Sequence, residues 1–159
     1  MKLYLSSFLI GNQKHQLTSL CQGRRAVVVA NALDNLSEAR MARLAGQQHE
    51  LRELGFSTEE LDLRDYFDEP DSLVKRLDTV DLVWVTGGNA FLLRRAMRQS
   101  GFDDCILARK HDDSLVYGGY SAGICVAGTS LRGLHLVDDA NATAEGYSSG
   151  TLWDGLPLV

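Results

Sequence analysis

The chain has 159 residues, of which 45% are hydrophobic and 23% charged. This balance suits one globular domain over residues 1–159 and excludes a disordered chain. The formal net charge of -5 argues against nucleic acid or an anionic membrane as the main partner. No apolar run is long enough to span a membrane, and residues 1–10 lack a signal-peptide pattern, so we expect a cytoplasmic protein.

Short apolar runs alternate with segments of helical period along the chain. The predicted strands cover residues 3–9, 26–30, 56–63, 82–85 and 115–117, and the predicted helices cover residues 36–54, 89–100 and 105–110. This alternation is typical of a parallel sheet covered by helices. We therefore predict an α/β fold, a three-layer sandwich with a mostly parallel sheet.

The helix over residues 36–54 has capping candidates at its start and a glycine at its end. Asp34, Asn35 and Ser37 could each cap the first turn, and Gly55 follows the last turn. The pattern places Leu44, Leu51 and Leu54 on one face of this helix.

The helix over residues 89–100 carries apolar and basic residues in separate rows. Leu92, Leu93, Ala96 and Met97 are predicted to face inward, and Arg94, Arg95 and Arg98 to face solvent, with Gly101 ending the helix. Pro70 and Pro157 are expected in loops.

The most informative segment is Leu-Val-Tyr-Gly-Gly-Tyr-Ser-Ala-Gly at residues 115–123, which has GxSxG spacing. Ser121 lies between an apolar strand and a predicted helix, so a tight turn would hold its hydroxyl at the carboxyl edge of the strand. We expect Gly119 and Gly123 to let the backbone turn sharply. Ser121 is thus a candidate nucleophile, and the alternative is a glycine-rich turn with a capping serine.

A second glycine turn, Thr86-Gly87-Gly88-Asn89, follows the strand over residues 82–85. In a parallel sheet this turn and the Ser121 turn emerge at the same edge, so the amides of Gly88 and Ala122 are candidates for an oxyanion hole. A side chain at Gly88 would obstruct the approach of a substrate carbonyl. Two alternatives stay open, which are a loop capped by Asn89 and a weak phosphate cradle. A general nucleotide-binding fold is less well supported, because GxGxxG and GxxxxGK[ST] are both missing.

The sequences Thr-Gly-Gly-Asn-Ala-Phe at 86–91 and Gly-Tyr-Ser-Ala-Gly at 119–123 together resemble the peptidase E family of serine peptidases, which includes α-aspartyl dipeptidase and has cyanophycinase as a relative. The resemblance implies a flavodoxin-like or class I glutamine amidotransferase-like fold. It also implies that Ser121 is the nucleophile and that the amides of Gly88 and Ala122 stabilise the oxyanion. The expected partner is a short peptide substrate, often with an N-terminal aspartate, and no metal or organic cofactor is expected. A homodimer is possible.

A serine nucleophile needs a base, and none of the four histidines fits this role well. His111 precedes the last predicted strand and belongs at the opposite edge of the sheet, while His49 lies in a solvated helix. His15 could at most border the cleft, and His135 is the only histidine after Ser121.

In the peptidase E family the base histidine follows a strand that would come shortly after residues 155–159, so the resemblance implies that the C-terminal part is missing from this chain. Asp138 and Asp139 fall where the family has an acidic residue, although either could cap a strand end. Three explanations stay open: an incomplete enzyme, an inactive homologue that binds a small ligand or partner, and a base from another subunit.

The arginines and the cysteines are two further groups of residues with a possible role at the site. Arg94 or Arg132 could recognise an aspartate by charge, although both are expected at the surface. The three cysteines, Cys21, Cys105 and Cys125, lack CxxC spacing, and no HExxH motif is present, so neither a disulfide framework nor a metal site is indicated.

Overall fold

The computed structural model describes residues 1–159, except for the side chain of Pro70. Its centre is a five-stranded sheet in the order β1-β5-β4-β2-β3, and every pair of neighbouring strands is parallel. The strands are β1 (Lys2–Ser6), β2 (Arg25–Val29), β3 (Ser57–Glu60), β4 (Leu82–Val85) and β5 (Val116–Tyr120). The prediction of a parallel α/β sheet is confirmed.

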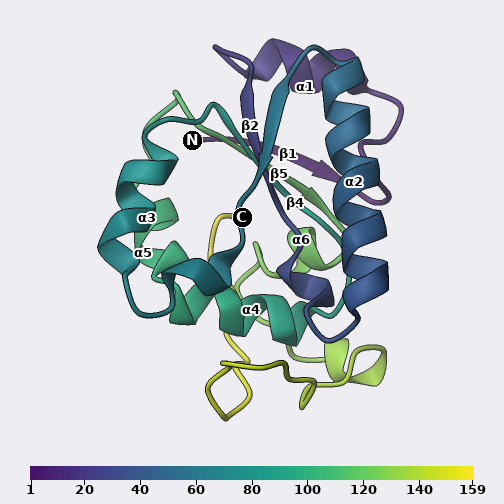
Figure 1. Cartoon of the computed structure of the whole chain (residues 1–159), viewed down its shortest axis with the longest axis vertical. Coiled ribbons are helices and arrows are strands. Elements are labelled where there is room, and N and C mark those ends of the chain that lie inside the picture. The colour runs from purple at the N-terminus through teal and green to yellow at the C-terminus, as the bar shows by residue number, and fades with distance from the viewer.

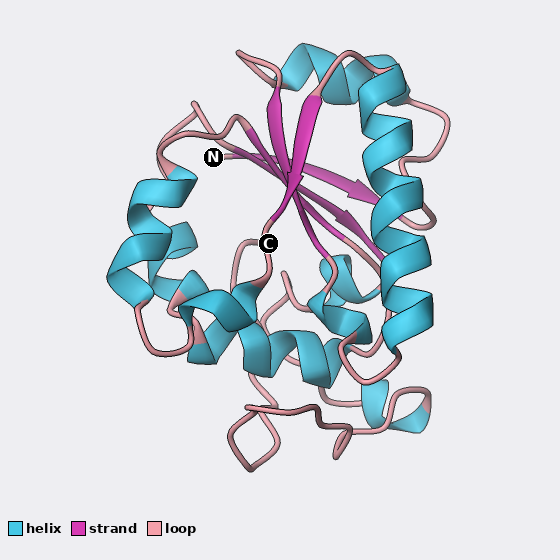
Figure 2. Cartoon of the chain, viewed as in Figure 1, coloured by secondary structure: helices cyan, strands magenta, loops and turns pink.

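Helices cover both faces of this sheet (Figures 1 and 2). One face packs against α1 (Lys14–Leu20) and α2 (Ser37–Glu53). The other face packs against α3 (Pro70–Leu77), α4 (Ala90–Gln99), α5 (Phe102–Ala108) and α6 (Ala122–Cys125). The predicted three-layer arrangement is therefore also confirmed.

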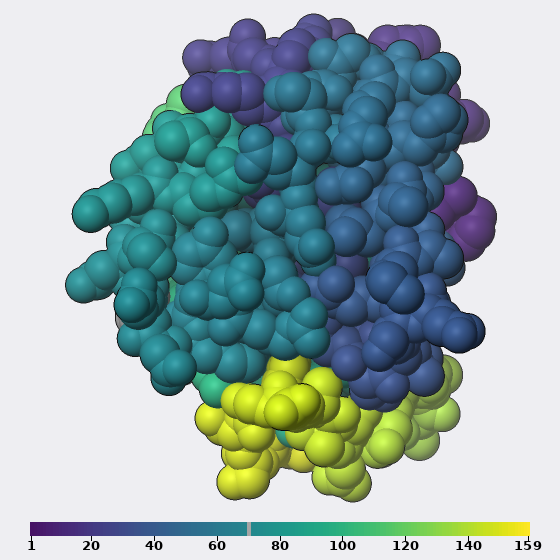
Figure 3. All heavy atoms as spheres, viewed as in Figure 1, coloured from purple at the N-terminus to yellow at the C-terminus, as the bar shows by residue number. Residues whose placement is uncertain are grey.

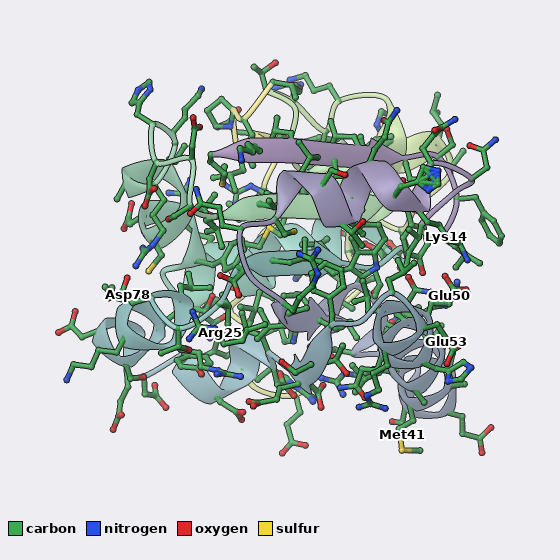
Figure 4. The ribbon with its side chains drawn as sticks, turned by 90° about the horizontal axis from the view of Figure 1, so that it is seen from above. Lys14, Arg25, Met41, Glu50, Glu53 and Asp78 are labelled. Atoms are coloured by element: carbon green, nitrogen blue, oxygen red, sulfur yellow. The ribbon has the colours of Figure 1, made fainter. Side chains whose placement is uncertain are left out.

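Alternate side chains of β4 supply the two halves of the core. Val83 and Val85 belong to the cluster beneath α3–α6, whereas Leu82 and Trp84 belong to the cluster beneath α1 and α2. The indole Nε1 of Trp84 donates a hydrogen bond to Oε1 of Gln47 at 2.7 Å, which satisfies both buried polar groups. Figure 4 shows Met41 on the outer side of α2, away from the sheet.

Two helices were not predicted from the sequence, and one strand is longer than predicted. Pro70 is the first residue of α3 and not a loop residue, because proline at a helix start gives up no hydrogen bond. The strand predicted to end at Tyr117 continues to Tyr120. A Cβ on Gly118 would lie 2.7 Å from Cε3 of Trp84, so this glycine makes room for the neighbouring indole.

The start of α2 differs from the prediction, because none of the three proposed residues caps it. Leu36 occupies the N-cap position without a side-chain hydrogen bond. The carboxylate of Asp34 turns instead to Arg40, whose Nε donates to its Oδ1 at 2.6 Å. This buried ion pair ties the turn before α2 to the helix itself.

The prediction that all three arginines of α4 face solvent is wrong for two of them. Arg94 and Arg95 are only 1% and 6% exposed, whereas Arg98 is largely exposed. The guanidinium of Arg94 donates two hydrogen bonds of 2.8 Å to the carboxylate of Asp103 on α5. Arg94 also donates to the carbonyl of Asp154 at 2.9 Å, so it joins α4, α5 and the C-terminal segment.

Most of residues 129–159, here called the C-terminal segment, gather at one end of the molecule, where Figure 3 colours them yellow-green to yellow. The last residues run back inward (Figure 1), and the carbonyl of Pro157 accepts a hydrogen bond from Nζ of Lys110. The one regular element of the segment is the short 3-10 helix Leu134–Leu136. The segment is attached to α4, since Gln99 Nε2 donates to the carbonyl of Gly146 at 2.8 Å. In the part of the chain that the structure describes, no helix is long and apolar enough to cross a membrane.

Candidate active site

Ser121 follows the last residue of β5 and is exposed at the carboxyl edge of the sheet. Its backbone angles are φ 53° and ψ −117°, a combination that non-glycine residues rarely adopt. Helix α6 begins at the next residue, and the carbonyl of Ser121 accepts hydrogen bonds from the amides of Ile124 and Cys125. The predicted strand–serine–helix turn is therefore present, although α6 is only one turn long.

The turn glycines act by close packing and not by the backbone freedom that we expected. The unusual φ belongs to Ser121 itself, and neither Gly119 nor Gly123 has a positive φ. A Cβ on Gly123 would lie 2.5 Å from the carbonyl oxygen of Val85, and one on Gly119 would lie 2.8 Å from the same oxygen. Two glycines are thus needed for β5 and α6 to approach the end of β4.

A buried tyrosine holds the turn from within the core. The hydroxyl of Tyr117 donates a hydrogen bond to the carbonyl of Gly123 at 2.7 Å. Burial raises the pKa of Tyr117 well above its usual value, so the hydroxyl keeps its proton and acts as a donor. Sequence analysis missed this contact, because a buried tyrosine on a strand normally indicates core packing alone.

The glycine turn after β4 lies directly beside Ser121. A Cβ on Gly87 would lie 2.9 Å from Cβ and 3.2 Å from Oγ of Ser121, so the backbone of Gly87 adjoins the nucleophile candidate. Gly88 has a φ of 149°, and a Cβ there would lie 2.5 Å from the carbonyl oxygen of Ala32. The protein's own backbone therefore requires glycine at position 88, independently of any space that a substrate would need.

This contact with Ala32 places the site between β2 and β4. The connection after β2 leads toward one edge of the sheet, and the connection after β4 leads toward the other edge. Ala32 follows β2 and Gly88 follows β4, and these two strands are neighbours. The amide of Asn89 donates to the carbonyl of Ala32 at 2.8 Å, which closes the gap between the two loops. Ligands of open α/β sheets bind where the connections diverge in this way.

The two amides proposed for the oxyanion hole are unoccupied by protein acceptors. Among the hydrogen bonds of the described residues, none uses the amide of Gly88 or the amide of Ala122 as donor. Two backbone N–H groups that lie next to an exposed hydroxyl can bind an oxygen that gains negative charge.

The start of α4 is capped by two groups. Oδ1 of Asn89 accepts from the amide of Leu92 at 2.9 Å, so Asn89 is the N-cap that the capping alternative predicts. Oδ2 of Asp138 accepts from the amide of Ala90 at 2.8 Å. Asp138 therefore caps a helix and not a strand end. Burial raises the pKa of the Cys125 thiol, and the charge of Asp138 raises this pKa further.

Comparisons with known proteins identify the family and the fold of this chain. The family model described as Peptidase family S51 matches residues 15–158. The chain belongs to peptidase family S51. A crystal structure of a protein from Listeria monocytogenes EGD-e, assigned as a peptidase E, superposes with a TM-score of 0.78 at 25% identity and covers 100% of this chain and 76% of its own.

A second solved structure is similar to this S51 chain in its fold. It is a peptidase from an acI-B1 Actinobacterium, with a TM-score of 0.63 and 19% identity, and the match covers 84% of this chain and 59% of that one. No curated protein sequence matched. The predicted resemblance to peptidase E is confirmed at the level of family and fold.

Among the described residues, no histidine of this S51 chain forms a hydrogen bond with Ser121. Within the described residues, no side chain forms a hydrogen bond with the Ser121 hydroxyl, and all four histidines are exposed. His135 lies edge-on to Trp153, with ring centroids 5.5 Å apart. Those same residues hold no group of three or more potential metal ligands.

Neither arginine considered for aspartate recognition is free at this site. Arg94 is buried and bound to Asp103, so the expectation that it lies at the surface is wrong. Arg132 is exposed, as expected, and its guanidinium lies over the ring of Trp153 at 5.6 Å from the centroid. A cavity of about 740 Å³ runs along β1 and the segment that leads into α1, and Ser121 is not among its lining residues.

Proposed function

We propose that this S51 family member is a serine peptidase that hydrolyses short peptides through an ester on Ser121. The observation that carries the proposal is the backbone of Ser121, whose φ of 53° holds an exposed hydroxyl beside the Gly87-Gly88 turn. A protein retains such a strained serine only where the surrounding packing enforces it, and strain of this kind gathers at reactive sites.

The proposed reaction has two steps. Oγ of Ser121 attacks the peptide carbonyl and loses its proton to a base, while the amides of Gly88 and Ala122 bind the carbonyl oxygen as it becomes negative. The C–N bond then breaks, and the amine leaves with the proton that the base returns. Water attacks the ester in the second step and releases the acid, which restores the serine.

In this structure, the described part of residues 1–159 places no base within hydrogen-bond distance of the Ser121 hydroxyl. Loss of the base in a serine hydrolase costs on the order of 10⁶ in turnover, so peptidase activity requires a base from outside these residues, contributed by a longer chain or by another subunit. A preference for an N-terminal aspartate is supported by the likeness to peptidase E alone, and dipeptides of the form Asp-Xaa are the proposed substrates.

The test uses the full-length protein and a fluorophosphonate probe. We expect the probe to label Ser121 and the protein to hydrolyse Asp-Leu faster than Leu-Leu. Ser121→Ala should abolish labelling and hydrolysis. Ser114→Ala is the matched control, because Ser114 is also exposed but precedes β5 at the opposite edge of the sheet.

The second candidate function is a binding module that uses the same cleft without catalysis. It is favoured by the lack of any described side chain that hydrogen-bonds the Ser121 hydroxyl. A folded full-length protein that neither reacts with the probe nor cleaves a dipeptide would establish this alternative over the peptidase.

A further inference from the structure

Arg94 and Arg95 are neighbours on α4, but within the described structure only Arg94 has a carboxylate partner. Arg94 is buried and forms a two-pronged ion pair with Asp103. Arg95 is also buried, at 6% exposure, but its Nε and Nη2 have no hydrogen-bond partner among the described groups, and no carboxylate there forms a salt bridge with it. A guanidinium keeps its charge in proteins, so a buried one without an anion is costly.

Arg95 lines a cavity of about 300 Å³ between α4 and the C-terminal segment. The other lining residues are Asn141, Thr143, Tyr147, Ser149, Gly150 and Thr151. They are all neutral, and no carboxylate is among them. This cavity therefore combines one unpaired positive charge with polar groups that can donate hydrogen bonds.

Several of these polar groups are available to a ligand. The side chains of Asn141, Thr143 and Ser149 make no hydrogen bond within the described part of the protein and are exposed toward solvent. Tyr147 is already engaged, since its hydroxyl donates to Oδ2 of Asp34 at 2.6 Å. That bond holds one side of the cavity in place, as does the hydrogen bond from the hydroxyl of Thr151 to the carbonyl of Ala140 at 3.1 Å.

We propose that this cavity binds a small oxyanion, a phosphate or a carboxylate, through the guanidinium of Arg95. The planar fork of an arginine matches two oxygens of either group, and the nearby amide and hydroxyls can satisfy the remaining oxygens. The site is separate from the proposed active site, because none of its lining residues belongs to the turns at 86–89 and 119–123.

The experiment is calorimetric titration of the full-length protein with sodium phosphate and with sodium succinate, each against sodium chloride at equal ionic strength. We expect at least one of the two oxyanions to bind, and Arg95→Met and Arg95→Gln to weaken its binding about tenfold or more. Arg98→Gln is the control on the same helix and should leave the affinity unchanged within about twofold. Binding of phosphate would identify the ligand as a phosphate, and binding of succinate would identify it as a carboxylate compound.

Two further measurements separate anion binding from effects on folding and on peptidase activity. Without added anion, Arg95→Met should melt at or above the temperature of the unmodified protein, because it removes an unpaired buried charge. Ser121→Ala should bind the oxyanion as the unmodified protein does, so a failed peptidase proposal would leave this one standing. Failure of both oxyanions to bind, or equal binding by Arg95→Met, would overturn it.

Discussion

The hydroxyl of Tyr117 donates to the carbonyl of Gly123 at 2.7 Å, and this bond joins the second residue of β5 to the first turn of α6 across the intervening serine. Tyr117→Phe should lower the free energy of unfolding by about 1–2 kcal/mol, since it leaves a buried carbonyl without its donor. It should also slow fluorophosphonate labelling of Ser121, because the turn loses an internal support.

Tyr4→Phe is the matched control for this variant. The hydroxyl of Tyr4 is also buried and donates to a backbone carbonyl, that of Ile10, at 2.7 Å. The two variants should lose similar stability in urea denaturation, but only Tyr117→Phe should change the labelling rate. Equal labelling rates would show that the Tyr117 bond has no role in positioning the serine.

Gly123→Ala should destabilise the protein by about 2 kcal/mol or more, because the added methyl would lie 2.5 Å from the carbonyl oxygen of Val85. Gly46→Ala provides the contrast. Gly46 lies within α2, and a Cβ there would meet nothing within 4 Å, so this change should stabilise the protein by about 0.5–1 kcal/mol. Thermal melting of the two variants checks both signs, and a stable Gly123→Ala protein would contradict the packing account.

Asp62 should make stability depend on pH in the acid range. Burial alone would raise its pKa, but hydrogen bonds from Arg64 and Asn31 and the charge of Arg40 outweigh burial and lower the pKa to about 2. Because the folded pKa lies below the unfolded one, the contribution is complete above pH ~4 and is lost as pH falls toward ~2.

The corresponding measurement is urea denaturation of Asp62→Asn between pH 2 and pH 6. The variant should lose up to about 2 kcal/mol at pH 6 and show a flatter pH profile than the unmodified protein. Asp68→Asn, at an exposed position, should keep the original profile. Parallel profiles for Asp62→Asn and the unmodified protein would contradict the assignment.

The buried pair of Arg94 and Asp103 should behave as a unit. Asp103→Leu should cost about 3–5 kcal/mol, because it leaves the guanidinium of Arg94 without its carboxylate inside the protein. The double variant Arg94→Met, Asp103→Leu should recover much of that loss. Asp104→Asn, on the exposed side of α5, should change stability by no more than about 0.5 kcal/mol. The free energies of unfolding are compared in a double-mutant cycle, measured by denaturation in guanidinium chloride.

The sequence indicated the sheet and the two glycine turns well, because strands such as β4 are uninterrupted apolar runs and parallel strands end at one edge. It located Ser121 at the turn, but it gave the wrong reason for Gly123. That glycine is needed because α6 packs against Val85, which is a contact between residues distant in the chain.

The errors at α4 have the same origin. Helical periodicity separates apolar from basic residues, and it does not reveal that a carboxylate on α5 and a carbonyl of the C-terminal segment will bury Arg94. Similarly, the local pattern indicated Asp34 as a helix cap. Its partners in the structure are Arg40 and Tyr147, which only the tertiary fold brings close to it. Local signals identify elements, whereas tertiary contacts decide which polar residues are buried.

The placement of β1 next to β5 has a consequence for synthesis on the ribosome. Lys2–Ser6 pairs with Val116–Tyr120, so the earliest strand to be translated has no partner in the described sheet until residue 120 has been made. Strands β2, β3 and β4 can meet sooner, because β2 pairs with both β3 and β4. We therefore expect the nascent chain to assemble these three strands first, with β1 joining late, when the turn that carries Ser121 is also being completed.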